Sequence, residues 1–180
     1  HFQTTPGDNW DYTATQHMIL ATLEIGGQPR RVIMQAPKNG FFYVLDRETG
    51  AFLSANNYAE ITWATGVHAE TGRPYESTLG NYDGQMRMIS PSPLGGHNRQ
   101  PMAFDPKSKL VFFPVHEMPG AYSLAKDFDP RTRSWNTGTG FEAIPYLVSG
   151  ARRAEAGSLR TQSGEADLTS SDVAGCLAAG

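Results

Sequence analysis

This 180-residue sequence contains little of what several classes of functional site require. Cys176 is its single cysteine, so the chain can form neither an internal disulfide nor a metal site built from several cysteines. It has no Cys-x-x-Cys-His motif for attaching a c-type haem and no apolar run long enough to cross a bilayer. The formal net charge of −3 lacks the basic excess of a nucleic-acid-binding protein. The histidines at positions 17, 68, 97 and 116 lack the spacing of zinc ligands.

The composition favours a globular fold made of short strands. Hydrophobic residues make up 39% and charged residues 18% of the chain, which is typical of a folded domain. Glycine and proline are abundant, at 19 and 12 residues, as expected where many strands are joined by turns. Helical periodicity is nearly absent before residue 150, so the sequence predicts an all-β fold.

Four apolar runs in the first third of the chain predict one antiparallel sheet. They are separated by turn sequences rich in Gly, Pro and Asn, of which Asn39-Gly40 is the strongest because both residue types tolerate positive φ. Four short strands within about 45 residues correspond to one blade of a β-propeller. The predicted strands are residues 17–24, 31–35, 41–45 and 51–55.

A second hairpin is predicted at residues 100–104 and 109–115. Its turn, which begins at Asp105, repeats the turn that begins at Asp46, because in both places an acid follows an apolar strand. The intervening residues 57–92 are poor in strand patterns, and Trp63-Ala64-Thr65-Gly66 is interpreted as a turn. A segment of this length without regular structure is usually functional or disordered.

Three motifs then occur in order: Trp10-Asp11-Tyr12, a Lys38-Asn39-Gly40 turn, and Asp46-x-x-Thr-Gly50 at the end of an apolar strand. This arrangement resembles the pyrroloquinoline quinone (PQQ) dependent alcohol dehydrogenases, whose eight-bladed propellers repeat the Asp-x-x-Thr-Gly motif. The resemblance covers roughly the first 145 residues. It implies a partial β-propeller of about three four-stranded antiparallel blades, and hence a fragment of such an enzyme.

The resemblance assigns the principal chemical role to Asp11. It implies that this carboxylate is the general base that removes the alcohol proton, and that it also ligates the metal ion. Thr13 stands where lanthanide-using relatives carry a second Asp, which fits calcium, a divalent cation that needs fewer carboxylates. The family's other calcium ligands, a Glu and an Asn, precede the base and are not in this chain. In isolation, an Asp in this setting would be interpreted as a turn or cap residue.

The resemblance also implies three cofactor-binding residues. Lys38 follows Asp11 by 27 residues, as the family's PQQ-contacting lysine does, although a lysine on such a turn is ordinarily just exposed. The segment from Gly95 to Met102 resembles the family's Gly-Ala-His-Asn-Trp-x-Pro-Met, so Asn98 is expected to reach PQQ unless it only forms an Asx turn. Arg99 replaces the family's Trp; it loses the aromatic wall but could hydrogen-bond a PQQ carboxylate.

Residues 149–180 differ from the rest. The last thirty are rich in Ala, Ser, Gly and Thr and have neither aromatic residues nor a strand pattern. We therefore expect residues 1–148 to form the partial PQQ-dehydrogenase propeller domain. The tail that follows is interpreted as a divergent end, a frame-shifted translation or a disordered terminus, and no domain is assigned to it.

The predicted function is that of a PQQ- and calcium-dependent alcohol dehydrogenase that oxidises small primary alcohols to aldehydes. Electrons would pass to a c-type cytochrome or to a haem domain that this chain lacks, and the family implies a periplasmic location. One alternative is a non-catalytic propeller, such as the outer-membrane assembly scaffold lipoproteins, which share the structural repeat. A scaffold has no reason to keep Asp11, Lys38 and Asn98 together. The other alternative is an inactive truncated remnant.

Overall fold

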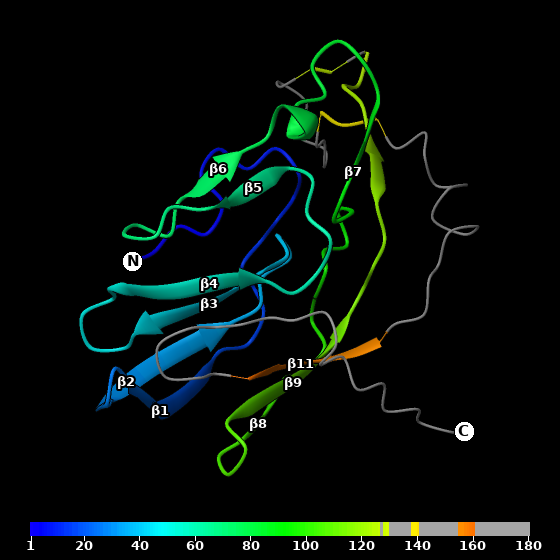
Figure 1. Ribbon diagram of the computed structural model, residues 1–180. Coiled ribbons are helices and arrows are strands. Elements are labelled where there is room, and N and C mark those ends of the chain that lie inside the picture. The colour runs from blue at the N-terminus through cyan, green and yellow to red at the C-terminus, as the bar shows by residue number, and fades with distance from the viewer. Residues whose placement is uncertain (127, 130–137, 141–154, 161–180) are drawn as a thin grey trace, which may run out of the picture.

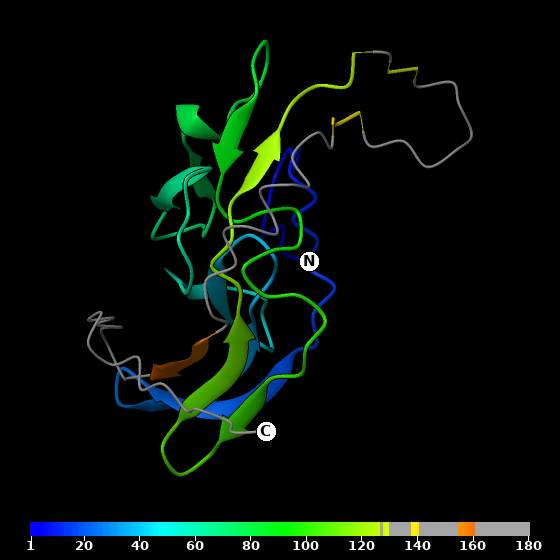
Figure 2. The same ribbon diagram turned by 90° about the vertical axis from the view of Figure 1, so that its right-hand side faces the viewer.

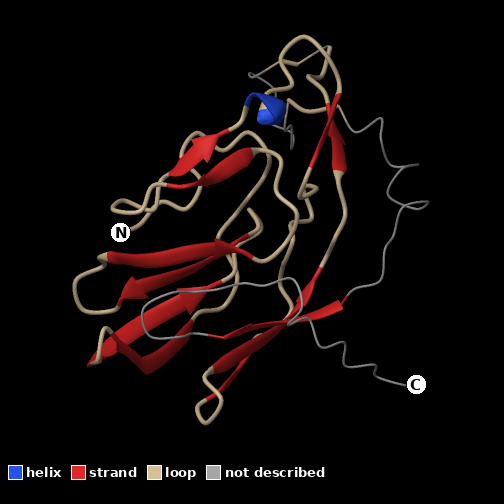
Figure 3. Cartoon of the chain, in the orientation of Figure 1, coloured by secondary structure: helices blue, strands red, loops and turns tan. Residues whose placement is uncertain are grey.

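The computed structural model describes residues 1–126, 128–129, 138–140 and 155–160, and these residues form an all-β structure with one short 3-10 turn (Figures 1 and 3). In chain order the elements are β1 (Ile19–Ile25), β2 (Gln28–Gln35), β3 (Phe41–Asp46), β4 (Phe52–Asn57), β5 (Ala64–Val67), β6 (Pro74–Glu76), η1 (Thr78–Gly80), β7 (Arg87–Ile89), β8 (Ala103–Asp105), β9 (Leu110–Val115), β10 (Gly120–Tyr122) and β11 (Glu155–Arg160). The described part of the chain contains no helix with the length and apolar character needed to cross a membrane.

The first four strands form one antiparallel sheet in the order β1-β2-β3-β4, which confirms the predicted blade. The β1–β2 hairpin turns at Gly26 and Gly27, whose φ angles of 61° and 72° suit a tight hairpin turn that other residue types adopt poorly. β2 begins three residues earlier than the predicted run, at Gln28, and pairs with β1 along its full length.

The predicted second hairpin is also confirmed, as β8 and β9. In the first turn, Asp46 Oδ1 accepts hydrogen bonds from the main-chain N–H groups of Glu48 and Thr49, both at 2.9 Å. In the second turn, the Asp105 carboxylate accepts from the N–H groups two and three residues later. The last turn residues, Gly50 and Lys109, both have positive φ, at 75° and 61°. The two turns are therefore copies of one structure, although the second lacks the glycine.

Two interpretations of the sequence were wrong. The segment from Trp63 to Gly66 is not a turn; its last three residues belong to β5, which pairs with β6 in a short hairpin. These strands have four and three residues, too short for an alternating pattern to be recognised. The end of the chain is not free of strands, since β11 pairs antiparallel with β9 through main-chain groups that any composition supplies. Residues 149–154 and 161–180 lie outside the described residues.

Two apolar clusters hold these sheets together. The first lies between the four-stranded sheet and β9, which are neighbours in Figure 2. In it Val32, Phe42 and Val44 pack with Val111 and Phe113, as the inner faces of adjacent blades would. The second is aromatic and lies between the start of the chain, β3, β5 and β10. Its buried rings are Trp10, Tyr12, Phe41, Tyr43, Trp63, Tyr82 and Tyr122.

The first turn predicts a loss of stability in acid. The main-chain N–H groups of Thr49 and Glu48 lower the pKa of Asp46 to about 2, from about 3.9 in an unfolded chain. Because the pKa is lower in the folded state, this stabilisation is complete above about pH 4 and is lost between about pH 4 and 2. Denaturant unfolding at stepped pH should show the loss, and Asp46→Asn should remove this component. Asp83→Asn, at an exposed carboxylate, should leave the profile unchanged.

Candidate functional site

Asp11 and Lys38 lie together in the structure. The Lys38 ammonium donates hydrogen bonds to Asp11 Oδ2 at 2.8 Å and to the Asp11 main-chain oxygen at 3.0 Å. Asp11 has a positive φ of 64°, and its main-chain oxygen and Oδ2 contact the same cation. The Lys38 side chain is 10% exposed and that of Asp11 is 61% exposed. The pair therefore presents an accessible carboxylate whose orientation is fixed by a buried ammonium.

The position of Asp11 follows from its two neighbours. Trp10 and Tyr12 are 4% and 2% exposed, and both rings pack on Trp63, with centroid separations of 4.9 and 5.5 Å. The Trp10 indole donates to the Gly80 carbonyl at 2.9 Å, and the Tyr12 hydroxyl donates to the Pro91 carbonyl at 2.5 Å. Burial of this hydroxyl raises the pKa of Tyr12, which keeps it a neutral donor. Two buried anchors thus hold the residue between them at the surface.

Lys38 lies in a segment, residues 36–40, whose main-chain carbonyls all accept hydrogen bonds from distant parts of the chain. His97 Nδ1 contacts the Ala36 carbonyl at 2.8 Å, and the Tyr58 hydroxyl donates to the Pro37 carbonyl at 2.5 Å. The carbonyls of residues 38, 39 and 40 accept from Gly96 N, Trp63 Nε1 and Tyr58 N at 3.0, 2.8 and 2.8 Å. The segment is buried, so each of these carbonyls needs such a donor.

The ammonium of Lys38 retains capacity for a ligand. A lysine has three N–H donors, and the described residues provide it with two acceptors, both on Asp11. The third N–H is available to an oxygen of a bound molecule. Such a donor suits any acceptor oxygen, and the oxygens of PQQ are among those it could bind.

Asn98 and Arg99 are placed less directly. The Asn98 side chain is half-buried and donates to the Leu94 carbonyl at 2.8 Å, which fixes a local turn. Arg99 is exposed. Among the described residues, neither side chain has a hydrogen bond or ion pair to Asp11 or Lys38. The structure therefore brings together the predicted base and lysine, and places the other two on the loop that packs against that lysine.

Two residues of this site escaped the sequence analysis. The sequence excluded His97 only as a zinc ligand; the residue is fully buried, with Nδ1 2.8 Å from the Ala36 carbonyl and Nε2 3.0 Å from the Gln100 carbonyl, and the neutral ring donates to one of the two. Tyr58, directly after β4, supports residues 36–40 through both its hydroxyl and its main-chain N–H. Their partners lie 61 and 21 residues away in the chain, so no local pattern could have revealed them.

A calcium ion would receive one ligand from this site. In the part of the chain that the structure describes, no cluster of three or more His, Cys, Asp or Glu residues could hold a metal ion. Asp11 offers an exposed carboxylate, which is a suitable ligand for a hard cation. Because the described residues contain no such cluster, the remaining calcium ligands would have to be other kinds of group or lie outside the described residues.

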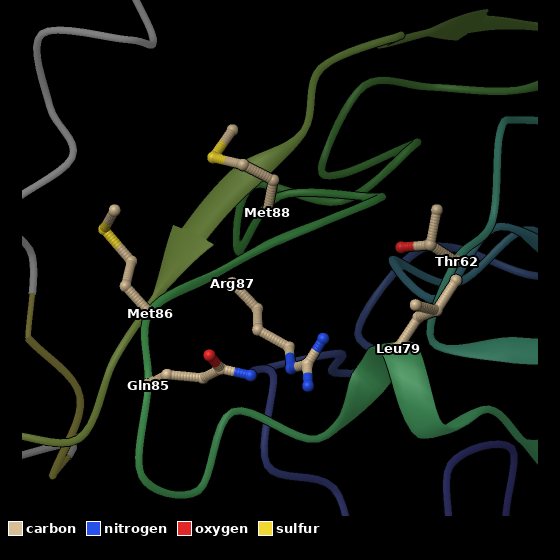
Figure 4. Close-up of a pocket in the computed structure, with 6 residues that line it drawn as sticks. All are labelled: Thr62, Leu79, Gln85, Met86, Arg87 and Met88. Atoms are coloured by element: carbon tan, nitrogen blue, oxygen red, sulfur yellow. The ribbon is translucent and has the colours of Figure 1, made fainter.

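A separate cavity of about 290 Å³ lies beside β7 and η1 (Figure 4). The Arg87 guanidinium extends between the Gln85 and Leu79 side chains, and Arg87 Nε is buried without a hydrogen-bond partner among the described residues. The other lining residues are Thr62, Met86 and Met88. The lining contains neither a carboxylate nor a histidine, so it offers no general base.

The buried histidine predicts a second, milder pH dependence. Burial lowers the pKa of His97, so the folded protein favours the neutral ring. Since the folded pKa is the lower one, the stabilisation is complete above the unfolded value of about 6.5 and is lost as the pH falls below it. Chemical unfolding between about pH 8 and 5 should show a stability that falls as the pH is lowered, and His97→Gln should flatten this slope. His68→Gln, at a partly exposed histidine, should preserve it.

Comparison with known proteins shows which family has this arrangement. A family model described as the glucose/ethanol/alcohol dehydrogenase β-propeller domain (PQQ) matches residues 1–74. The quinohemoprotein alcohol dehydrogenase ADH IIB of Pseudomonas putida is 50% identical over 156 residues, which cover 84% of this chain and 22% of the relative. The 1-butanol dehydrogenase (cytochrome c) of Thauera butanivorans is 49% identical over 119 residues, or 66% of this chain and 17% of the relative.

A solved structure agrees with these relatives. The crystal structure of the quinohemoprotein alcohol dehydrogenase from Comamonas testosteroni superposes with a TM-score of 0.77 and 38% identity, over 89% of this chain and 24% of that one. The chain spans about a fifth of the length of the curated relatives it matches. The fold, the motifs and these matches agree, and the chain belongs to the PQQ-dependent quinoprotein alcohol dehydrogenase family, of whose β-propeller it forms a part.

Proposed function

We propose that the polypeptide carrying this chain is a PQQ- and calcium-dependent alcohol dehydrogenase that oxidises small primary alcohols to aldehydes. The observation that carries this proposal is the 2.8 Å contact between Lys38 Nζ and Asp11 Oδ2. It joins the two residues that the resemblance assigns to proton removal and to cofactor contact, although 27 residues separate them in the chain. A propeller with a purely structural role has no need of an exposed carboxylate held in this way.

Asp11 is the proposed general base. Oδ2 is engaged by the ammonium, and no described residue hydrogen-bonds Oδ1. The free oxygen of an exposed carboxylate can accept the hydroxyl proton of an alcohol placed beside it. The Lys38 ammonium donates to both the side chain and the main chain of Asp11, so that the base is oriented before the substrate arrives.

The cofactor would be held by residues on both sides of this pair. PQQ, when bound, supplies the acceptor for the hydride that the alcohol loses. Lys38 would direct its third N–H to a PQQ oxygen, where a positive charge favours the negative charge that develops during the reaction. Asn98 and Arg99 would bind the rim of PQQ from the neighbouring loop, Arg99 through a carboxylate.

The remaining assignments follow the same reasoning. Asp11 would be one calcium ligand, and Thr13 at the lanthanide-distinguishing position supports calcium. A c-type cytochrome, or a haem domain outside this chain, is the proposed electron acceptor, in keeping with the name of the Thauera relative. We propose a periplasmic location, as the family implies, and a division into a propeller part (1–148) and a tail (149–180). The pairing of β11 with β9 means that the tail contributes one strand.

The test replaces the two paired residues and measures dye-linked ethanol oxidation by the protein loaded with PQQ and Ca²⁺. Asp11→Asn should lower kcat about 10²- to 10⁴-fold, because it removes a general base while keeping the shape. Lys38→Ala should weaken PQQ binding and lower kcat about 10²- to 10³-fold, because it removes a charged donor beside the reacting oxygen.

Asp83→Asn serves as the matched control, since it removes an exposed carboxylate elsewhere, and should leave kcat unchanged. Full activity in both the Asp11 and the Lys38 variants would exclude the proposed site. PQQ binding with no alcohol oxidation by the parent protein would retain the cofactor site but exclude the proposed reaction.

A further inference from the structure

We propose that the loop Gly95-Gly96-His97 is a positioning clamp that holds Lys38 in its contact with Asp11, and that Gly95 is glycine because no side chain fits between the loop and the lysine. The clamp itself is argued from contacts within this chain. Its catalytic consequence rests on the function proposed above.

Gly95 lies directly against the stem of Lys38. A Cβ atom at this position would lie 2.5 Å from Lys38 Cγ, 2.6 Å from Cβ and 2.7 Å from Cα. These separations are far below van der Waals contact, and the Cα atom belongs to the main chain of a buried segment, so it cannot move aside cheaply. Gly95 also has a φ of 82°, a conformation that other residues rarely adopt. The close approach and the backbone angle independently require glycine.

The loop is fixed to the lysine's own segment on either side of this contact. Gly96 N donates to the Lys38 carbonyl at 3.0 Å, and His97 Nδ1 reaches the Ala36 carbonyl at 2.8 Å. His97 is fully buried, and its ring packs edge-on against Phe113 at a centroid separation of 5.3 Å. On the outer side, His116 N donates to the Gly96 carbonyl at 2.7 Å, which ties the loop to the end of β9. The clamp is therefore anchored in the core.

Such a clamp meets a physical need. A lysine side chain has four rotatable bonds, and ordering it costs conformational entropy. Packing Gly95 against Cβ and Cγ removes alternative rotamers, so the ammonium is already directed at Asp11 when a substrate arrives. Among the described residues no hydrogen bond joins Gly95 or His97 to Asp11; they act through Lys38 and are therefore positioning residues.

The test compares two glycine substitutions with the same backbone strain. Gly84 has a φ of 81°, nearly that of Gly95, but a Cβ there would meet nothing within 4 Å. Gly95→Ala and Gly84→Ala therefore differ in the contact with Lys38. The readout is the rate at which an amine-reactive acetylating reagent modifies Lys38 in the full chain, measured by mass spectrometry, with exposed Lys107 as the internal reference.

We expect Gly95→Ala to raise the Lys38 modification rate about tenfold relative to Lys107, equivalent to roughly 1.4 kcal/mol in the equilibrium between held and released ammonium. Gly84→Ala should leave the ratio at the parent value. An unchanged ratio in Gly95→Ala, or an equal rise in both variants, would overturn the clamp. Circular dichroism of each variant establishes that the fold is intact. If Gly95→Ala does not fold, His97→Gln takes its place, and an unchanged Lys38 rate in that variant would overturn the proposal.

A parallel titration with PQQ in the presence of Ca²⁺ separates this inference from the proposed function. If Lys38 is released in Gly95→Ala and PQQ affinity falls as in Lys38→Ala, both stand. If Lys38 is released while Lys38→Ala itself leaves PQQ affinity unchanged, the clamp stands and the cofactor role of Lys38 does not. If Lys38→Ala weakens PQQ binding but Gly95→Ala changes neither the modification rate nor the affinity, the clamp fails alone.

Discussion

The buried main-chain carbonyls of residues 36–40 are the constraint on which the site depends. Such groups are costly to leave without a donor in the interior of a protein. Here the donors come from Tyr58 just after β4, from Trp63 just before β5, and from the loop before β8, so this short turn is where several parts of the chain must meet. Lys38 is carried by that turn, and its ammonium is therefore placed by contacts that hold the sheets together.

The other half of the site depends on aromatic packing. Trp10 and Tyr12 lie in the same cluster as Trp63, and their polar atoms donate to carbonyls 70 and 79 residues further along the chain. Asp11 lies between these two buried residues. It is at the surface and has a left-handed backbone conformation. Trp63 contributes to both halves, since it packs on Trp10 and Tyr12 and donates to the Asn39 carbonyl. Its burial links the carboxylate and the cation through one ring.

The strands that could be predicted from sequence are those with strong local patterns. β1 to β4 are bounded by Gly-Gly, Asn-Gly and Thr-Gly turns, and the Asp105 turn repeats the hydrogen bonds of the Asp46 turn even though Lys109 replaces the glycine. β5 is too short to show a pattern, and β11 pairs with β9 through main-chain groups, so their sequences were uninformative. Arg99 was chosen by motif position alone, and the described residues give it no contact with the Asp11–Lys38 pair.

By itself, the sequence determined the all-β class and the first blade, which was predicted within residues 17–55 and is formed by residues 19–57. These are local properties, because they follow from side-chain alternation and turn residues, whereas Asp11 and Lys38 were chosen through the family resemblance. Only the tertiary structure decided that the two residues share a hydrogen bond, that His97 supports the main chain before Lys38, and that Gly95 must have no side chain. Those outcomes depend on burying groups that lie up to 61 residues apart, and burial is a property of the packed chain.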